Sequence, residues 1–167
     1  RQLFYNQPAR LKFLRGAAVE TSHVSTVVSQ YALGYPEIAF RLVVDGRENL
    51  ASPGTGILLD AVRAVYGPAV AGAMLAVDAG TGTLVESSAL AGRLAGGVTG
   101  VISQPQVTRS TRSYISLFVN RRSIGSRQLA FAVEQAYEGL IGEGRHPIAV
   151  VHLSVDPRFV DVNVHPS

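Results

Sequence analysis

The sequence predicts a mixed α/β fold of the α+β kind. Hydrophobic residues make up 47% of the 167-residue chain, which is enough to bury a core. Apolar residues recur at helical spacing in some stretches and form short branched or aromatic runs in others, with glycine and proline between them. Because both patterns occur throughout the chain, we expect one mixed domain with a short appendage.

The first 36 residues are predicted to form a strand, a turn and a helix. Residues 3–5 are apolar and enter a turn at residues 6–8, whose proline can begin a short helix. A longer helix is expected over residues 21–33, and Gly34 and Pro36 should end it. Its expected buried stripe consists of Val24, Val27, Val28, Tyr31 and Ala32.

A hairpin and two helical segments are expected next. Residues 38–44 and 47–51 are typical of two strands joined by a tight turn at Asp45-Gly46. Thr55 is a candidate cap for a helix that Gly67 closes, and residues 68–74 add a further helical turn.

The second half of the chain alternates strands with one helix. Residues 75–77 and 93–103 are predicted strands, and the sequence predicts no particular structure for the loop between them. An apolar strand over residues 114–119 ends at Asn120 and runs into an arginine doublet. Ser126 then caps a helix expected to reach Gly142, and strands follow at residues 148–155 and 160–164. The inward face of that helix would hold Leu129, Val133, Ala136, Tyr137, Leu140 and Ile141.

The arginine doublet lies in a window without acidic residues. Residues 87–133 contain six arginines, whereas the rest of the chain has nine basic and twelve acidic residues. The net charge of +3 is therefore a local excess of cation, which favours a nucleic-acid-binding surface. The alternative is a solvated basic face without a ligand. The six are Arg93, Arg109, Arg112, Arg121, Arg122 and Arg127.

Other kinds of site find little support. The single lysine, Lys12, follows no glycine-rich loop, so a phosphate-loop signature is missing. The four histidines lack metal-ligand spacing, and no nucleophile-elbow pattern is present. The absence of cysteine fits a reducing cytoplasm, and no apolar run is long enough to cross a membrane. We therefore expect a cytoplasmic protein with no metal site.

Three motifs resemble one family, the MutL DNA mismatch-repair proteins. LFYNQPARLKFL is similar to the family's LFxNTPARxKFL motif, YISLFVNRRSI to its FVNGR strand, and VDVNVHPS to its VDVNVHPxK signature. The motifs occur in the family's order and span nearly the whole chain, which makes the joint match specific.

The resemblance implies part of an ATPase of the GHKL class, shared with gyrase and Hsp90. Residues 1–34 would be the tail of the ATPase domain. Residues 35–167 would be a transducer with the fold of ribosomal protein S5 domain 2, a mixed sheet with helices packed on one face. The family's ATP-hydrolysing residues lie upstream, so this chain, which resembles an excised piece, should contain no catalytic residue and bind no cofactor. The whole parent would be a weak ATPase that uses ATP and Mg.

The resemblance also implies partners. The transducer would couple ATP binding and hydrolysis to dimerisation and to sequence-independent DNA binding. Further expected partners are a mismatch-recognition protein of the MutS family and a second copy of the chain, with a nucleoid-associated location and no membrane contact. Two alternatives stay open: the transducer of another GHKL ATPase such as a type II topoisomerase, and a stand-alone RNA-binding module of S5-like fold.

DNA-binding residues are assigned partly by motif and partly by charge. The family's DNA-contacting arginines correspond only loosely to positions in this chain, to Arg122 and then to Arg127. Arg109, Arg112 and Arg121 are added from charge alone. Because Arg121 replaces the glycine of FVNGR, we expect no positive φ at that position.

The two terminal motifs are given supporting roles. The first would hold the last strand and helix of the ATPase domain in place, either with its arginine buried against a carboxylate or helix end or with that arginine free in solvent. Its residues are Asn6, Pro8, Ala9 and Arg10. The last motif would support an ATP site by fixing the strand that delivers a lysine beyond Ser167 to the γ-phosphate. Its residues are Asn163, His165 and Pro166.

Overall fold

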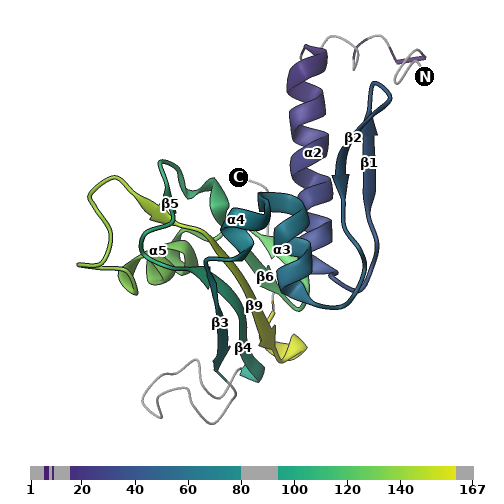
Figure 1. Cartoon of the computed structure of the whole chain (residues 1–167). Helices are drawn as coiled ribbons and strands as arrows, with labels where there is room; N and C mark the ends of the chain where they lie inside the picture. The colour runs from purple at the N-terminus through teal and green to yellow at the C-terminus, as the bar shows by residue number, and fades with distance from the viewer. Residues whose placement is uncertain (1–5, 8, 10–15, 80–93, 161–167) are drawn as a thin grey trace.

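The centre of the fold is a five-stranded mixed sheet with the strand order β3-β4-β9-β6-β7 (Figure 1). The computed structural model describes residues 6, 7, 9, 16–79 and 94–160. Strands β6 and β9 run parallel, and all other neighbouring strands of this sheet are antiparallel. The strands are β3 (Met74–Ala79), β4 (Leu94–Ser103), β6 (Ile115–Val119), β7 (Arg122–Ile124) and β9 (Ala149–Val155).

Alternate residues of the central strands face two separate hydrophobic layers. Val150 of β9 and Phe118 of β6 belong to one layer, and Val151 and Leu117 belong to the other. The first layer packs against α2, α3 and α4, and the second against α5. Their bounds are α2 (Ala17–Gly34), α3 (Leu58–Tyr66), α4 (Pro68–Ala71) and α5 (Arg127–Gln135).

Helices therefore cover both faces of the sheet, where we expected them on one. The physical reason lies in the central parallel pair, because β9 is an almost continuous apolar strand whose two faces both need cover. The mixed α/β class itself is confirmed.

Two smaller sheets and two 3₁₀ turns complete the described part of the chain. The predicted hairpin is present as β1 (Arg41–Val44) and β2 (Arg47–Ala51), and its turn residues have positive φ, 49° at Asp45 and 77° at Gly46. The second pair consists of β5 (Thr108–Arg109) and β8 (His146–Pro147). The turns are η2 (Arg112–Tyr114) and η3 (Pro157–Phe159).

The long helix α2 forms as predicted, but three residues of its expected apolar stripe are exposed, while Val28 is half-buried and Ala32 is buried. Val24, Val27 and Tyr31 are 49%, 54% and 53% exposed, and only the last turn of the helix is buried. The reason is geometric, because only the C-terminal end of α2 lies over the sheet (Figure 1). Gly34 permits this contact, since a Cβ there would lie 2.9 Å from the ring of Phe118.

Two predicted helix ends differ from those observed. Ile57, and not Thr55, is the N-cap of α3, and the Thr55 hydroxyl accepts from the Ile57 backbone N–H at 3.3 Å. Ser126 does cap α5, but the helix ends at Gln135 and gives way to turns in which Gly139 has φ 75°. Leu140, expected to face inward, is 61% exposed.

Candidate nucleic-acid interface

A tight turn at Asn120-Arg121 joins β6 to β7. Val119 pairs with Arg122, and the two turn residues have φ values of 47° and 70°. Two-residue hairpin turns with positive φ match the twist of the strands they connect. The expectation that Arg121 avoids positive φ was therefore wrong, because the hairpin sets the backbone there whatever the side chain.

Asn120 fastens this turn to the central strand. Its side-chain amide donates to the carbonyl of Val155 at 2.8 Å, and its side-chain oxygen accepts from the Val155 N–H at 2.9 Å. The Asn120 backbone N–H donates to the carbonyl of Leu153 at 2.9 Å. The turn that carries the arginine doublet is thus held rigidly at the end of β9.

Arg121 is engaged in contacts with the segment after α2. Its guanidinium pairs with the carboxylate of Glu37 and lies over the ring of Tyr35, 4.5 Å from the centroid. The hydrogen bond from Arg121 lowers the pKa of Glu37. This arginine therefore connects two parts of the chain and offers less free charge to a ligand than its sequence position indicated.

Arg109 and Arg112 are also engaged. Arg112 Nε lies 2.8 Å from Glu134 Oε1, and His146 Nδ1 lies 2.5 Å from the same oxygen. Burial alone would raise the pKa of Glu134, but the hydrogen bonds from Arg112 and His146 outweigh it, and the pKa is lowered. The half-buried Arg109 lies over the Tyr114 ring, 5.1 Å from its centroid.

The five predicted arginines do not form one patch. Arg109 and Arg112 precede β6, and Arg121 follows it, so a five-residue strand of about 16 Å separates the two groups. Glu37 and Glu134 come from outside the acid-free window and pair with one arginine in each group. Residues 87–133 contain no acidic residue, but in the folded chain acidic side chains from other segments lie beside two of their arginines.

Arg122 and Arg127 differ from the other three. Both are exposed, and neither has an ion pair within the described residues. Arg122 begins β7, the edge strand of the sheet, and Arg127 is the first residue of α5 after the Ser126 cap. The structure thus brings two unpaired cations to one edge of the sheet.

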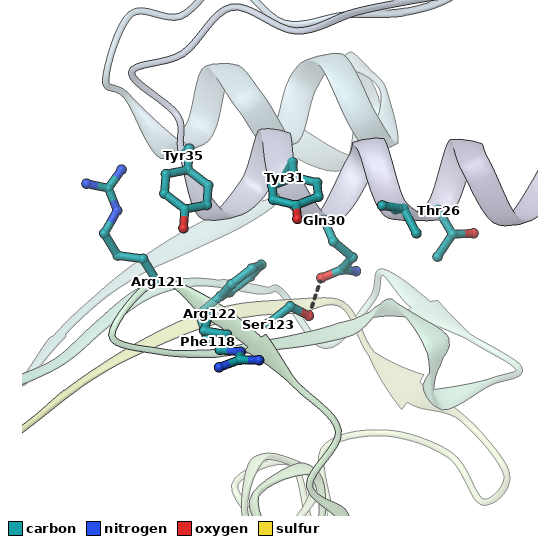
Figure 2. Close-up of a pocket in the computed structure, with 9 residues that line it drawn as sticks. Thr26, Gln30, Tyr31, Tyr35, Phe118, Arg121, Arg122 and Ser123 are labelled. Atoms are coloured by element: carbon teal, nitrogen blue, oxygen red, sulfur yellow. Dashed lines mark hydrogen bonds between the residues drawn. The ribbon is translucent and has the colours of Figure 1, made fainter. Parts of the chain in front are cut away.

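A groove lies beside this edge, between α2 and the β6–β7 hairpin (Figure 2). Its volume is about 520 Å³, and Tyr31, Tyr35, Gln30, Arg122 and Ser123 are among its lining residues. Sequence reasoning missed it, because the spacing of α2 predicts one apolar face but not which part of that face stays uncovered.

The supporting residues predicted at the two ends of the chain remain predictions. Asn6 lies in a turn, Ala9 is helical, and both are exposed. The remaining members of the first set, Pro8 and Arg10, lie outside the described residues. So does the whole last set, Asn163, His165 and Pro166. In the part of the chain that the structure describes, no helix is long and apolar enough to cross a membrane.

Comparison with known sequences gives a consistent family. A family model described as "DNA mismatch repair protein, C-terminal domain" matches residues 62–167, well over half of the chain. The DNA mismatch repair protein MutL of Desulforudis audaxviator is 47% identical over 167 residues, which is 100% of this chain and 27% of that protein. MutL of Halalkalibacterium halodurans is 39% identical over 166 residues, 99% of this chain and 24% of that protein. The chain thus spans about a quarter of the length of these relatives.

Solved structures agree on the fold. The N-terminal domain of a DNA repair protein superposes with a TM-score of 0.74 at 22% identity, covering 99% of this chain and 51% of that one. The Aquifex aeolicus MutL ATPase domain complexed with ADP gives a TM-score of 0.62 at 22% identity, covering 94% and 51%. The family assignment decides against the topoisomerase and RNA-binding alternatives. The sequence match and the shared fold together place this chain in the MutL family of DNA mismatch repair proteins.

Proposed function

We propose that this chain is the transducer part of a mismatch repair ATPase, and that it binds DNA phosphates without regard to base sequence. Residues 1–34 would belong to the ATPase domain and residues 35–167 to the transducer. The observation that carries the DNA proposal is the position of Arg122 and Arg127, which are exposed, free of ion pairs among the described residues and adjacent to the same sheet edge.

The chemistry of this edge suits phosphate. Guanidinium groups bind phosphate oxygens with directed, charge-assisted hydrogen bonds. Arg127 also stands at the N-terminal end of α5, where the helix dipole favours an anion. Contacts to phosphate carry no sequence information, so the binding that we propose is independent of base sequence. Arg109, Arg112 and Arg121 would act in support.

A link between α2 and the hairpin gives the transducer role a physical basis. Arg121 contacts Glu37 and Tyr35 beyond the end of α2, and Ser123 of β7 donates to Gln30 of α2 at 3.3 Å. A shift of α2 would therefore move the strand that carries Arg122. Binding of ATP and Mg by the rest of the parent protein would cause such a shift of α2. The partners of the parent protein would be a second copy of itself and a MutS-family protein.

The test is a charge-reversal experiment on duplex DNA. The double variant Arg122→Glu/Arg127→Glu should lose low-salt binding, measured by fluorescence anisotropy. The slope of log K against log salt should become shallower by about 1.8, at about 0.9 for each lost phosphate contact.

A charge-matched control separates a local site from net charge. Arg47 on β2 and Arg63 on α3 are exposed and lie on other elements. The variant Arg47→Glu/Arg63→Glu should retain most of the affinity and the wild-type salt slope. Equal losses in the two double variants, or wild-type binding by Arg122→Glu/Arg127→Glu, would overturn the proposed surface.

A further inference from the structure

The side of α5 that faces away from the sheet carries an exposed ring and an exposed cation. Leu129, Ala130 and Val133 are the residues through which this helix packs on the sheet. Arg127 and Phe131 are one helical turn apart on the other side, and Phe131 is 57% exposed. The remaining exposed residues of α5 are neutral, namely Gln128, Ala132 and Gln135. The outward face of α5 therefore combines a guanidinium with a phenyl ring.

The single acidic residue of α5 does not oppose this cation. The side chain of Glu134 is only 14% exposed, and its carboxylate is occupied by Arg112 and His146, at 2.8 Å and 2.5 Å. Arg127 itself has no ion pair within the described residues. An anion that approaches Arg127 therefore meets no free carboxylate of α5.

Arg122 projects on the same side of the sheet as α5. Along β7, Ser123 donates a hydrogen bond to α2, whereas Ile124 packs into the hydrophobic layer under α5. Because successive side chains of a strand point to opposite faces, Arg122 shares the face of Ile124. Figure 2 shows its guanidinium on the far side of β7 from Tyr31. The exposed cations Arg122 and Arg127 therefore lie on the face of the sheet that α5 covers.

A hollow of about 410 Å³ lies next to Phe131, and small-ligand sites hold about 300 to 1,000 Å³. It extends from α5 to the turns that follow this helix, and Phe131 and Ile141 give it an apolar part. The glutamates and arginines of its lining have opposite signs: Arg112, Glu134, Glu138, Glu143 and Arg145. Because these charges nearly balance, the hollow suits a neutral planar group better than an anion. An anion is favoured instead at Arg122 and Arg127, which do not line the hollow.

We propose that α5 carries a stacking site for an unpaired base of a DNA strand, with the base on the ring of Phe131 and the neighbouring phosphates at Arg127 and Arg122. Proteins bind single strands without sequence preference through aromatic side chains beside cationic groups. Charge complementarity identifies the occupant, because a purely apolar partner would leave both guanidinium groups without a counter-charge. A paired base is not available to Phe131, since its faces are already stacked in the duplex. The inference rests on the proposed DNA-binding function and adds a residue that contacts bases.

The first experiment compares the affinities of the 167-residue chain for an oligothymidine and for a duplex of equal length. Phe131→Leu keeps an apolar side chain and removes the ring, so oligothymidine binding should weaken by about 5- to 100-fold. Duplex affinity should change by less than about twofold, and Phe131→Tyr, which keeps the ring, should bind both DNAs like wild type. Tyr31 is an exposed aromatic residue of α2 outside the hollow, so Tyr31→Leu should leave both affinities unchanged.

A second experiment reports on stacking directly. The chain contains no tryptophan, so Phe131→Trp introduces a single indole at the proposed site. A base stacked on that indole should quench its fluorescence when oligothymidine is added. The same addition should leave the emission of Tyr31→Trp, whose single indole is on α2, unchanged. Quenching of neither variant, or equal quenching of both, would overturn the stacking site.

The outcomes separate this inference from the proposed function. The inference also requires that Arg122→Glu/Arg127→Glu weaken oligothymidine binding. If Phe131→Leu binds oligothymidine as well as wild type while the double variant loses duplex binding, the stacking site is wrong and the phosphate surface stands. If Phe131→Leu and the double variant both lose oligothymidine binding while both keep duplex binding, the surface for duplex DNA fails and the stacking site stands. An equal loss of both DNAs in Phe131→Leu would overturn the preference for an unpaired base.

Discussion

The guanidinium of Arg121 pairs with the carboxylate of Glu37, which lies 84 positions earlier in the sequence. The pair spans the junction between the segment after α2 and the turn that carries the arginine doublet. Because Arg121 also lies over Tyr35, it contacts this segment through both charge and ring. The positive φ of Arg121 favours glycine at this position, whereas the contacts with Glu37 and Tyr35 require the arginine side chain.

The first prediction separates these two preferences. The positive φ of Arg121, 70°, is unfavourable for any residue with a Cβ, so Arg121→Ala keeps the backbone strain and loses both contacts. Arg121→Gly loses the same contacts but relieves the strain. We expect the glycine variant to be more stable than the alanine variant by about 1 kcal/mol in urea unfolding. Equal stabilities would mean that the turn changes conformation when the arginine is removed.

A second prediction concerns the close approach of β4 to β9. Gly100 has φ 154°, and a Cβ there would lie 2.1 Å from the carbonyl oxygen of Val150. Gly100→Ala must displace a central strand, and it should lower the free energy of unfolding by about 3 kcal/mol or prevent folding. Gly125→Ala is the matched control, since nothing lies within 4 Å of its added Cβ. A change below 1 kcal/mol at position 100 would contradict the observed strand pairing.

A third prediction tests the buried hydroxyl of Tyr137. The side chain is 3% exposed, and its hydroxyl donates to the carbonyl of Ser103 at 2.5 Å. Tyr137→Phe removes the donor from a dry site, so the free energy of unfolding should fall by about 1 kcal/mol. Tyr31→Phe removes a hydroxyl from a half-exposed ring and should have no measurable effect. If Tyr137→Phe and Tyr31→Phe unfold at the same urea concentration, the prediction for the Tyr137 hydroxyl is contradicted.

Local patterns predicted the elements that depend on local chemistry. The Asp45-Gly46 turn was found because both residue types favour positive φ, and Ser126 was found because its hydroxyl can cap a helix. The Asn120-Arg121 turn has the same geometry but was missed, because arginine carries no local signal for that backbone. Its presence follows from the pairing of β6 with β7, which is tertiary information.

The arrangement of charge could be predicted only in part for the same reason. The acid-free window includes Arg122 and Arg127, which are exposed, but it did not distinguish them from Arg109, Arg112 and Arg121. It did not reveal Glu37 and Glu134, which reach their arginines only after the sheet has formed. The periodicity of α2 likewise predicted a helix, but the coverage of its apolar stripe depends on how far the helix extends beyond the sheet.

The last prediction concerns His152, at the centre of the sheet. Its ring stacks on Phe118 at a centroid distance of 4.6 Å, and its Nε2 is buried without a hydrogen-bond partner among the described residues. Burial lowers the pKa of His152, and the charge of Arg121 lowers it further, whereas a backbone hydrogen bond with Leu33 opposes both. The neutral ring is therefore the form that the folded chain prefers.

The sign of the pH dependence follows from that preference. As the pH falls through about 6.5, the unfolded chain takes up a proton at this histidine before the folded chain does, so the unfolded state is favoured. Stability should be full above that pH and decline toward pH 5, with a limiting slope of about 1.4 kcal/mol per pH unit. Urea unfolding of wild type and His152→Gln between pH 5 and 7.5 measures this dependence. The free energy of unfolding of the variant should change less steeply with pH than that of wild type. His23 is exposed on α2, so His23→Gln should retain the wild-type slope. Parallel profiles for wild type and His152→Gln would show that His152 takes up its proton equally in the folded and unfolded chain.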